Sequence, residues 1–219
     1  MKDNNILEVL NLSLNFNSKR LFHNLSFSLE KGEKAIITGK SGSGKTTLLR
    51  CLMGFSHPDS GTITIKGRTL SEHSVWKARQ NIGFVPQEPD LGDKTVLEFL
   101  KHPFSFKSNK TLRWEDNFLH KLMSTFHLDR DNLQKKTKLL SGGEKQRIAL
   151  LSSLLLKREI YFLDEVTAAL DDETRASIID YLKQQNDITF LFVSHDKKIK
   201  DMSHKIISLN KKPGTRGGR

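Results

Sequence analysis

Apolar and polar residues alternate through much of the first 85 positions, which predicts β-strands joined by short turns. Alternating apolar residues occur over 6–16, alternation is clean over 25–29, and a continuous apolar run over 34–38 predicts a buried strand. One helix is expected at 45–53, ending at Gly54. The predicted strands of this part are 6–16, 25–29, 34–38, 61–65 and 82–85.

The pattern changes between Gln87 and Leu140, where helical periods replace the strand-like runs. After Leu140, helix and strand alternate again, which predicts a parallel sheet with crossover helices. A helical sub-domain at about 88–157 is therefore expected inside an α/β core. The predicted helices are 95–100, 114–126, 142–156 and 172–185, and the later strands are 160–163 and 188–193.

Length and composition favour one compact domain of a cytoplasmic protein. The 219 residues suffice for one core with a sub-domain, here expected over 1–210, with a basic, glycine-rich, flexible tail at 211–219. No window holds 18 consecutive apolar residues, and the first residues lack a secretory signal. Cys51 is the only cysteine, so no intrachain disulfide can form.

The net charge is +11, from 36 basic and 25 acidic residues. A solvated surface, anionic lipid and nucleic acid all remain compatible with it.

A glycine-rich loop stands between the buried strand at 34–38 and the helix at 45–53. Its glycines let backbone N–H groups turn toward phosphate oxygens at the positive end of the helix. Lys45 is expected to reach the β- and γ-phosphates, and Thr46 to ligate magnesium. The predicted nucleotide-binding residues of this loop are Gly39, Lys40, Ser41, Gly42, Ser43, Gly44, Lys45, Thr46 and Thr47, with the Lys40 side chain facing solvent.

An apolar strand at 160–163 leads directly into two acids, Asp164 and Glu165. Ligands of open α/β sheets bind at the carboxyl ends of the strands, where both acids should lie. Asp164 is expected to hold magnesium, and Glu165 to orient and polarise the attacking water as a general base. The alternative is that both acids cap the next turn.

The stretch Leu140-Ser141-Gly142-Gly143-Glu144 opens the helix at 142–156. Ser141 and Glu144 fit a capping box, with Ser141 as the N-cap. A helix N-terminus opened by two glycines is also an anion site. The two interpretations are compatible.

Together, the phosphate loop, this stretch and the acidic strand end resemble the nucleotide-binding domain of ABC transporters, from about Ile6 to Leu209. The resemblance implies an α/β fold: a phosphate-loop NTPase core with a mostly parallel sheet, an N-terminal antiparallel β sub-domain and an inserted helical sub-domain. It implies an ATPase with ATP and Mg²⁺ as cofactors. It also implies a head-to-tail homodimer in which Ser141, Gly142 and Gly143 contact the γ-phosphate held by the opposite subunit.

Four single residues match further positions of that family. Gln87 matches a glutamine that touches magnesium and moves with the helical sub-domain. Asp171 matches a loop residue that crosses the dimer interface, and His195 matches the histidine that contacts the γ-phosphate. Phe16 aligns with the aromatic residue that stacks on adenine, and a core position is the alternative for its ring.

The residues after Glu165 depart from the common family form, because Val166 replaces a proline and Ala168 replaces a serine. No catalytic group is lost, so hydrolysis is expected to be intact. This variant looks like the small bacterial ATPases of the Fet type, which are assigned to iron export.

The resemblance implies an integral-membrane permease as partner and a peripheral position on the inner face of the cell membrane. We expect the permease to dock on the segment 88–106, with Phe104 and Phe106 exposed. No nucleic acid is expected, although a soluble ABC ATPase acting on DNA or ribosomes is the main rival. A phosphate-loop kinase or GTPase is a second rival, but neither needs the stretch at 141–143.

Overall fold

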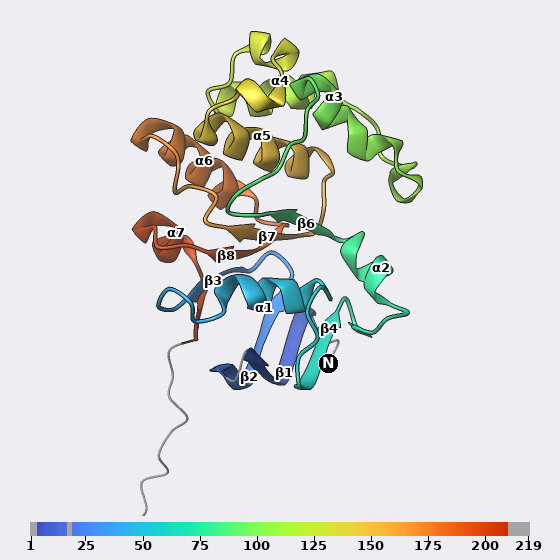
Figure 1. Cartoon of the computed structure of the whole chain (residues 1–219), viewed down its shortest axis with the longest axis vertical. Helices are drawn as coiled ribbons and strands as arrows, with labels where there is room; N and C mark the ends of the chain where they lie inside the picture. Colours follow the sequence, from blue (N-terminus) through green and yellow to red (C-terminus); the bar gives the residue numbers. More distant parts are fainter. Residues whose placement is uncertain (1–3, 17–18, 210–219) are drawn as a thin grey trace, which may run out of the picture.

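The computed structural model describes residues 4–16 and 19–209, which form two β-sheets with helices on both sides of the larger one (Figure 1). The predicted tail at 211–219 lies outside the described residues. The helices are α1 (Lys45–Leu52), α2 (Val75–Arg79), α3 (Val96–Lys101), α4 (Asp116–Thr125), α5 (Gly142–Leu155), α6 (Asp172–Gln184) and α7 (Lys197–Met202). Short 3₁₀ turns are η1 (His102–Ser105), η2 (Lys107–Asn109), η3 (Arg130–Gln134) and η4 (Thr137–Leu139).

The central sheet is parallel throughout its described pairs, in the order β6-β7-β8-β3-β9. Crossover helices link strands of this kind, as the alternation of helix and strand predicted. Its strands are β3 (Lys34–Thr38), β6 (Ile82–Val85), β7 (Ile160–Asp164), β8 (Thr189–Val193) and β9 (Lys205–Ser208).

The second sheet is antiparallel and has the order β2-β1-β4-β5. It consists of β1 (Asn5–Phe16), β2 (Lys19–Glu30), β4 (Ser60–Ile65) and β5 (Arg68–Thr69). The α/β class, the parallel sheet and the N-terminal antiparallel sheet were all predicted correctly.

Two buried clusters of apolar side chains lie on opposite faces of the parallel sheet. Tyr161 and Leu163 of β7 face the cluster shared with α4, α5 and α6. Ile160 and Phe162 face the other cluster, which α1 and the antiparallel sheet complete. Figure 1 shows the resulting layers, with α5 and α6 on one side of the sheet and α1 on the other. Burial on both faces explains why β3, β7 and β8 contain continuous apolar runs.

Some elements were predicted too short or were missed. β2 begins at Lys19 rather than Leu25, because it pairs with β1 along its whole length, from Phe16↔Lys19 to Asn5↔Glu30. Its first half has no clean alternation, so only pairing with β1 defines it as a strand. Tertiary contacts likewise decide α2, α7, β5 and β9, which are too short for a periodic signal.

Candidate functional site

The phosphate loop joins the end of β3 to the start of α1. Gly42 and Gly44 have φ of 70° and 94°, a region that side-chain-bearing residues rarely adopt. A Cβ on Gly44 would also lie 3.1 Å from the Leu21 Cβ. Lys45 folds back over the loop, since its Nζ donates to the carbonyl oxygens of Gly39 at 3.0 Å and Lys40 at 3.4 Å. The loop is thus shaped around a lysine ammonium at a helix N-terminus.

The first turn of α1 favours an anionic ligand. Gly44 is its N-cap, no side chain caps the helix, and no acidic residue lies in its first turn. The Ser43 hydroxyl is buried and has no hydrogen-bond partner among the described residues. The Lys40 side chain is exposed, as expected. A phosphate group would satisfy both the helix end and the serine hydroxyl.

Asp164 ends β7 and is only 1% exposed. The Thr46 Oγ1 donates to its Oδ2 at 2.7 Å, whereas its Oδ1 is buried without a hydrogen-bond partner in the described chain. Burial raises the pKa of this carboxyl, although the Thr46 hydroxyl and the Lys45 charge act in the opposite direction. An orphaned, buried carboxylate oxygen beside a threonine hydroxyl fits Mg²⁺, which takes few protein ligands when phosphates supply others.

Glu165 is held in an unusual backbone conformation next to Asp164. Its φ is 49°, and its N–H donates to the Val193 carbonyl oxygen at 2.8 Å, at the end of β8. Left-handed backbone at a residue other than glycine costs of order 1–3 kcal/mol, and such strain often occurs at functional sites. This backbone hydrogen bond joins the end of β7, where Glu165 stands, to the end of β8 near His195.

The Glu165 carboxylate faces His195, with 3.6 Å between Oε1 and Nε2. Its side chain is 15% exposed, whereas the His195 side chain is 70% exposed. Burial raises the pKa of the Glu165 carboxyl, the His195 charge lowers it, and the neighbouring Asp164 raises it. A carboxylate with a raised pKa beside an accessible histidine is suited to general-base chemistry.

The stretch at 141–144 forms the predicted capping box at the start of α5. The Glu144 N–H donates to the Ser141 Oγ at 3.2 Å, and the Ser141 N–H donates to the Glu144 carboxylate at 2.8 Å. The two glycines differ in their surroundings. A Cβ on Gly143 would lie 2.9 Å from the Ala169 carbonyl oxygen, while a Cβ on Gly142 would meet nothing within 4 Å. The glycine pair therefore faces open space on one side and the loop after β7 on the other.

The remaining predicted residues lie at the edges of this region. Phe16 is 60% exposed, so the alternative of a core position for its ring is wrong. Gln87 is exposed and follows β6, whose Val85 pairs with Leu163 next to Asp164. Asp171 caps α6, because its Oδ1 accepts from the Thr174 N–H at 2.8 Å. Hydrogen bonds and local charges join Lys45, Thr46, Asp164, Glu165 and His195 into one group.

One arginine at this sheet edge was not predicted. Arg175 of α6 contacts both the loop that follows β7 and the loop that carries His195. No sequence motif pointed to it, because its partners lie on two separate loops.

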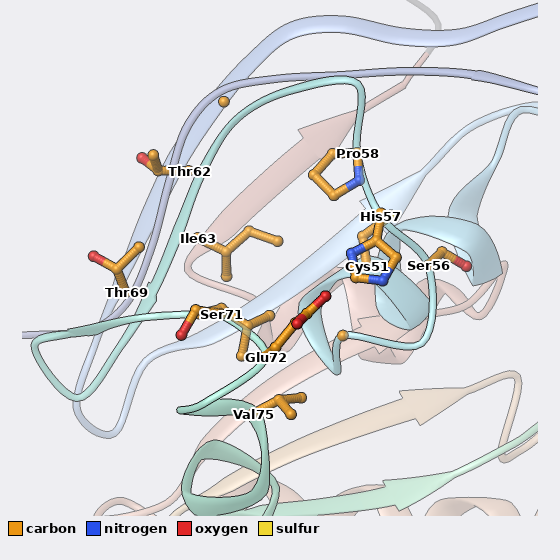
Figure 2. A pocket seen from close by; sticks show the side chains of 13 residues that line it. Cys51, Ser56, His57, Pro58, Thr62, Ile63, Thr69, Ser71, Glu72 and Val75 are labelled. Atoms are coloured by element: carbon orange, nitrogen blue, oxygen red, sulfur yellow. The ribbon is translucent and has the colours of Figure 1, made fainter.

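A cavity of about 500 Å³ lies away from these residues, between the end of α1, the β4–β5 hairpin and α2 (Figure 2). Ile63, Val75 and the buried Cys51 are among its apolar lining residues, and His57 and Glu72 are polar ones. Burial raises the pKa of the Cys51 thiol to about 11, with the Asp59 charge adding to the effect. The cavity contains none of the predicted site residues.

The family model described as ABC transporter matches residues 22–168. The chain belongs to the ABC transporter family. Within it, the chain is 35% identical over 223 residues to "Energy-coupling factor transporter ATP-binding protein EcfA" of Pediococcus pentosaceus, covering 94% of this chain and 76% of that relative. It is 32% identical over 219 residues to "Probable iron export ATP-binding protein FetA" of Escherichia coli K12, covering 98% of this chain and 96% of that one.

A solved ABC cassette, a dimer in a post-hydrolysis state bound to ADP and phosphate, superposes with a TM-score of 0.81. The two sequences are 27% identical, and the superposition covers 92% of this chain and 93% of the cassette's chain. The prediction of an ABC transporter ATPase is confirmed, and the Fet type is one of several similar groups. Among the described residues, this ABC ATPase has no helix long and apolar enough to cross a membrane.

Proposed function

We propose that this ABC ATPase hydrolyses ATP at the carboxyl edge of its parallel sheet and drives a separate integral-membrane permease. The observation that carries the proposal is the grouping of Lys45, Thr46, Asp164, Glu165 and His195 beside an uncapped helix N-terminus. Residues 1–210 act as one ATPase domain in this proposal, and the helices at about 88–157 form its moving sub-domain.

Phosphate binding is assigned to the loop 39–47. Lys45 would exchange its two carbonyl contacts for the β- and γ-phosphates, and the N–H groups at the start of α1 would face phosphate oxygens. Thr46, Asp164 and Gln87 are the residues proposed to hold Mg²⁺. When bound, this ion would neutralise phosphate charge. Asp164 is pre-oriented for the ion because the Thr46 hydroxyl fixes one of its two oxygens.

Glu165 is proposed as the general base. Its carboxylate would accept a proton from the attacking water as the oxygen–phosphorus bond forms and ADP leaves. His195 lies 3.6 Å from this carboxylate and is exposed enough to reach the γ-phosphate at the same time. Of these two groups, Glu165 carries the proton and His195 orients the phosphate.

Adenine binding is assigned to Phe16, whose exposed ring offers a stacking face. Because the ring is exposed, a Phe16→Ala variant should keep its melting temperature and raise the KM for ATP. A lowered melting temperature with unchanged KM would contradict the assignment.

We infer that two copies form the ATP-bound state as a homodimer. Ser141, Gly142 and Gly143 open α5 with little side-chain bulk, and Gly142 faces open space where a phosphate of the other copy could lie. Asp171 belongs to the loop after β7, which contacts Gly143 through Ala169. The dimeric cassette bound to ADP and phosphate supports this arrangement.

The predicted docking segment needs a revision. Phe104 is partly buried, and its ring packs edge-on against Trp114 at 5.4 Å, so it stabilises the fold instead of forming a free surface. Phe106 is 47% exposed and remains a candidate contact. Polar substitution of Phe106 alone therefore tests docking without disturbing the core.

A second pair of exposed aromatic residues extends this candidate surface. Phe55 follows α1 and is 55% exposed, and Trp76 of α2 is 69% exposed. The Arg79 guanidinium lies 4.0 Å from the Phe55 ring and 5.1 Å from the Trp76 ring, and it also donates to backbone carbonyls. Figure 1 draws α2 and the segment after α3 on the same side of the molecule. We assign this side to the permease, which keeps the ATPase peripheral on the cytoplasmic face of the membrane.

Docking is tested with Phe106→Thr against the matched control Ile206→Thr. Ile206 is also exposed, at 51%, but it lies on β9 at the other edge of the parallel sheet from β6. The Phe106 variant should keep basal ATPase activity and lose co-purification with the permease, and the control should keep both. Equal recovery of the permease by both variants would move the docking surface elsewhere.

Iron export is our proposal for the cargo, supported by the likeness to the probable iron export protein and by the variant residues at 166–168. The chain has a similar identity to an energy-coupling factor transporter protein, whose name states no cargo. Deletion of the gene should raise cellular iron and iron sensitivity. Unchanged values of both would reject iron.

The decisive experiment is purification of a tagged Glu165→Gln variant from its own membranes with ATP. A stoichiometric multi-span membrane protein is expected with it. Recovery with ribosomes or nucleic acid would support the rival, a soluble ABC ATPase acting on those partners. Loss of ATP hydrolysis in this variant, with ATP binding retained, tests the general base in the same preparation.

A further inference from the structure

Two loops at the carboxyl edge of the sheet carry Glu165 and His195, and they also contact each other's surroundings away from these two side chains. One loop, 165–171, follows β7, and the other, 194–196, follows β8 and carries His195. A backbone hydrogen bond runs from the Glu165 N–H of the first loop to the carbonyl oxygen of Val193, the last residue of β8 before the second loop. His195 itself is 70% exposed, so its position depends on what anchors the residues beside it.

Arg175 joins the two loops. Its Nη2 donates to the Leu170 carbonyl oxygen at 2.7 Å, at the end of the first loop. Its Nε lies 3.8 Å from the Asp196 Oδ2, next to His195 in the second loop. A third contact runs from Nη1 to the Asp172 carboxylate at 2.9 Å, which orients the guanidinium. A planar guanidinium can donate two hydrogen bonds and face a nearby carboxylate at the same time, which a lysine ammonium cannot do in the same geometry.

Asp196, the residue that Arg175 contacts, also forms hydrogen bonds on both sides of His195. Its side chain is 15% exposed, and its Oδ1 accepts from the Lys198 N–H at 2.8 Å, so it caps α7. Its own N–H donates to the Ser194 Oγ at 3.0 Å. Hydrogen bonds therefore hold the residues on both sides of His195, and Arg175 contacts Asp196 as well as the end of the loop 165–171.

We propose that Arg175 is a positioning residue for ATP hydrolysis, holding the loop 194–196 so that His195 stays opposite Glu165. The proposal rests on the proposed function of these two residues. Because Leu170 belongs to the loop that contacts Gly143 through Ala169, the same arginine links the start of α5 to the position of His195. A displaced His195 misaligns the γ-phosphate and the water, and misplacement by about 1 Å can reduce the rate roughly 10²-fold.

The test compares Arg175→Ala with Arg175→Lys and with Lys183→Ala, a matched control on an exposed position of the same helix. Steady-state ATPase assays, binding of a fluorescent ATP analogue and thermal unfolding are measured on each full-length protein. Arg175→Ala should lower kcat about 10- to 100-fold with the KM for ATP within about twofold of the unaltered protein. Arg175→Lys should restore part of kcat through the Asp196 contact, and Lys183→Ala should leave it unchanged.

A double-variant experiment separates positioning from a general effect on folding. Single-turnover assays with radiolabelled ATP compare His195→Ala with His195→Ala/Arg175→Ala. If Arg175 acts through His195, the second substitution adds less than twofold to the loss. A full, independent loss in the double variant, or an unchanged kcat in Arg175→Ala, overturns the proposal while the ATPase function stands. Failure of the unaltered protein to hydrolyse ATP would overturn the function and the positioning role together.

Discussion

Replacing each glycine of the pair at the start of α5 by alanine should have opposite effects on stability. In a helix, alanine is more favourable than glycine by about 0.5–1 kcal/mol. Gly142 faces open space, so Gly142→Ala should gain stability of this size. A Cβ on Gly143 would lie 2.9 Å from the Ala169 carbonyl oxygen, a backbone atom that cannot rotate away. Overpacking of this kind costs typically about 1–3 kcal/mol.

The two variants share the helix gain, so the overpacking term alone separates them. For a protein of this size, 1 kcal/mol shifts the melting temperature by about 2–4 °C. Gly143→Ala should therefore melt about 2–12 °C below Gly142→Ala. Thermal unfolding followed by circular dichroism, without nucleotide and at low protein concentration, measures this difference without a contribution from dimer formation or bound ATP.

Hydrolysis should respond differently from stability. Both methyl groups stand at the proposed phosphate-binding end of α5, so both variants should lose ATPase activity although Gly142→Ala is the more stable protein. An equal or higher melting temperature for Gly143→Ala would refute the close approach to the Ala169 carbonyl. Full ATPase activity in Gly142→Ala would refute the proposed contact with the other subunit's nucleotide.

Three further outcomes are expected. Glu165→Gln should raise the melting temperature at pH 7 and lower kcat about 10²- to 10⁴-fold. Burial raises the pKa of the Glu165 carboxyl, so the stability that this carboxyl contributes is present below the unfolded value of 4.5 and is lost as pH rises through the folded pKa. The unaltered protein and Glu165→Gln should therefore converge in melting temperature below about pH 4. Asp171→Ala should lower the melting temperature because α6 loses its N-cap, whereas Asp171→Asn should keep the melting temperature of the unaltered protein. Equal melting temperatures for the two variants would show that the cap does not stabilise the fold. The Cys51 thiol, whose pKa burial raises to about 11, should react with iodoacetamide at pH 8 only after urea unfolding, and rapid labelling of the native protein would contradict its burial.

Local patterns carried most of the fold prediction. The central parallel strands β3, β7 and β8 are buried on both faces, so each contains a continuous apolar run that the sequence displays directly. The phosphate loop was predictable because its glycines and lysine are consecutive, and the capping box because Ser141 and Glu144 are three positions apart. Short elements such as α2 and β9 were missed, since pairing and packing with distant residues define them.

Phe16 and Phe104 show why aromatic residues were harder to assign. Phe16 was assigned to adenine stacking with a core position as the alternative, and Phe104 was expected to be exposed. Phe16 is exposed, and Phe104 is partly buried against Trp114, ten positions away. Burial depends on which distant side chains pack against a ring, so it does not follow from local sequence.

The sequence by itself determined the family, the α/β class and the residue types for binding phosphate, because consecutive or regularly spaced residues encode each of them. Only the tertiary structure decided that the Thr46 hydroxyl bonds to Asp164, that Glu165 faces His195, and that Arg175 joins two loops. These contacts join residues far apart in the chain, on the ends of neighbouring parallel strands and the helices beside them. Strand order and register bring such ends together, and no local pattern records either one.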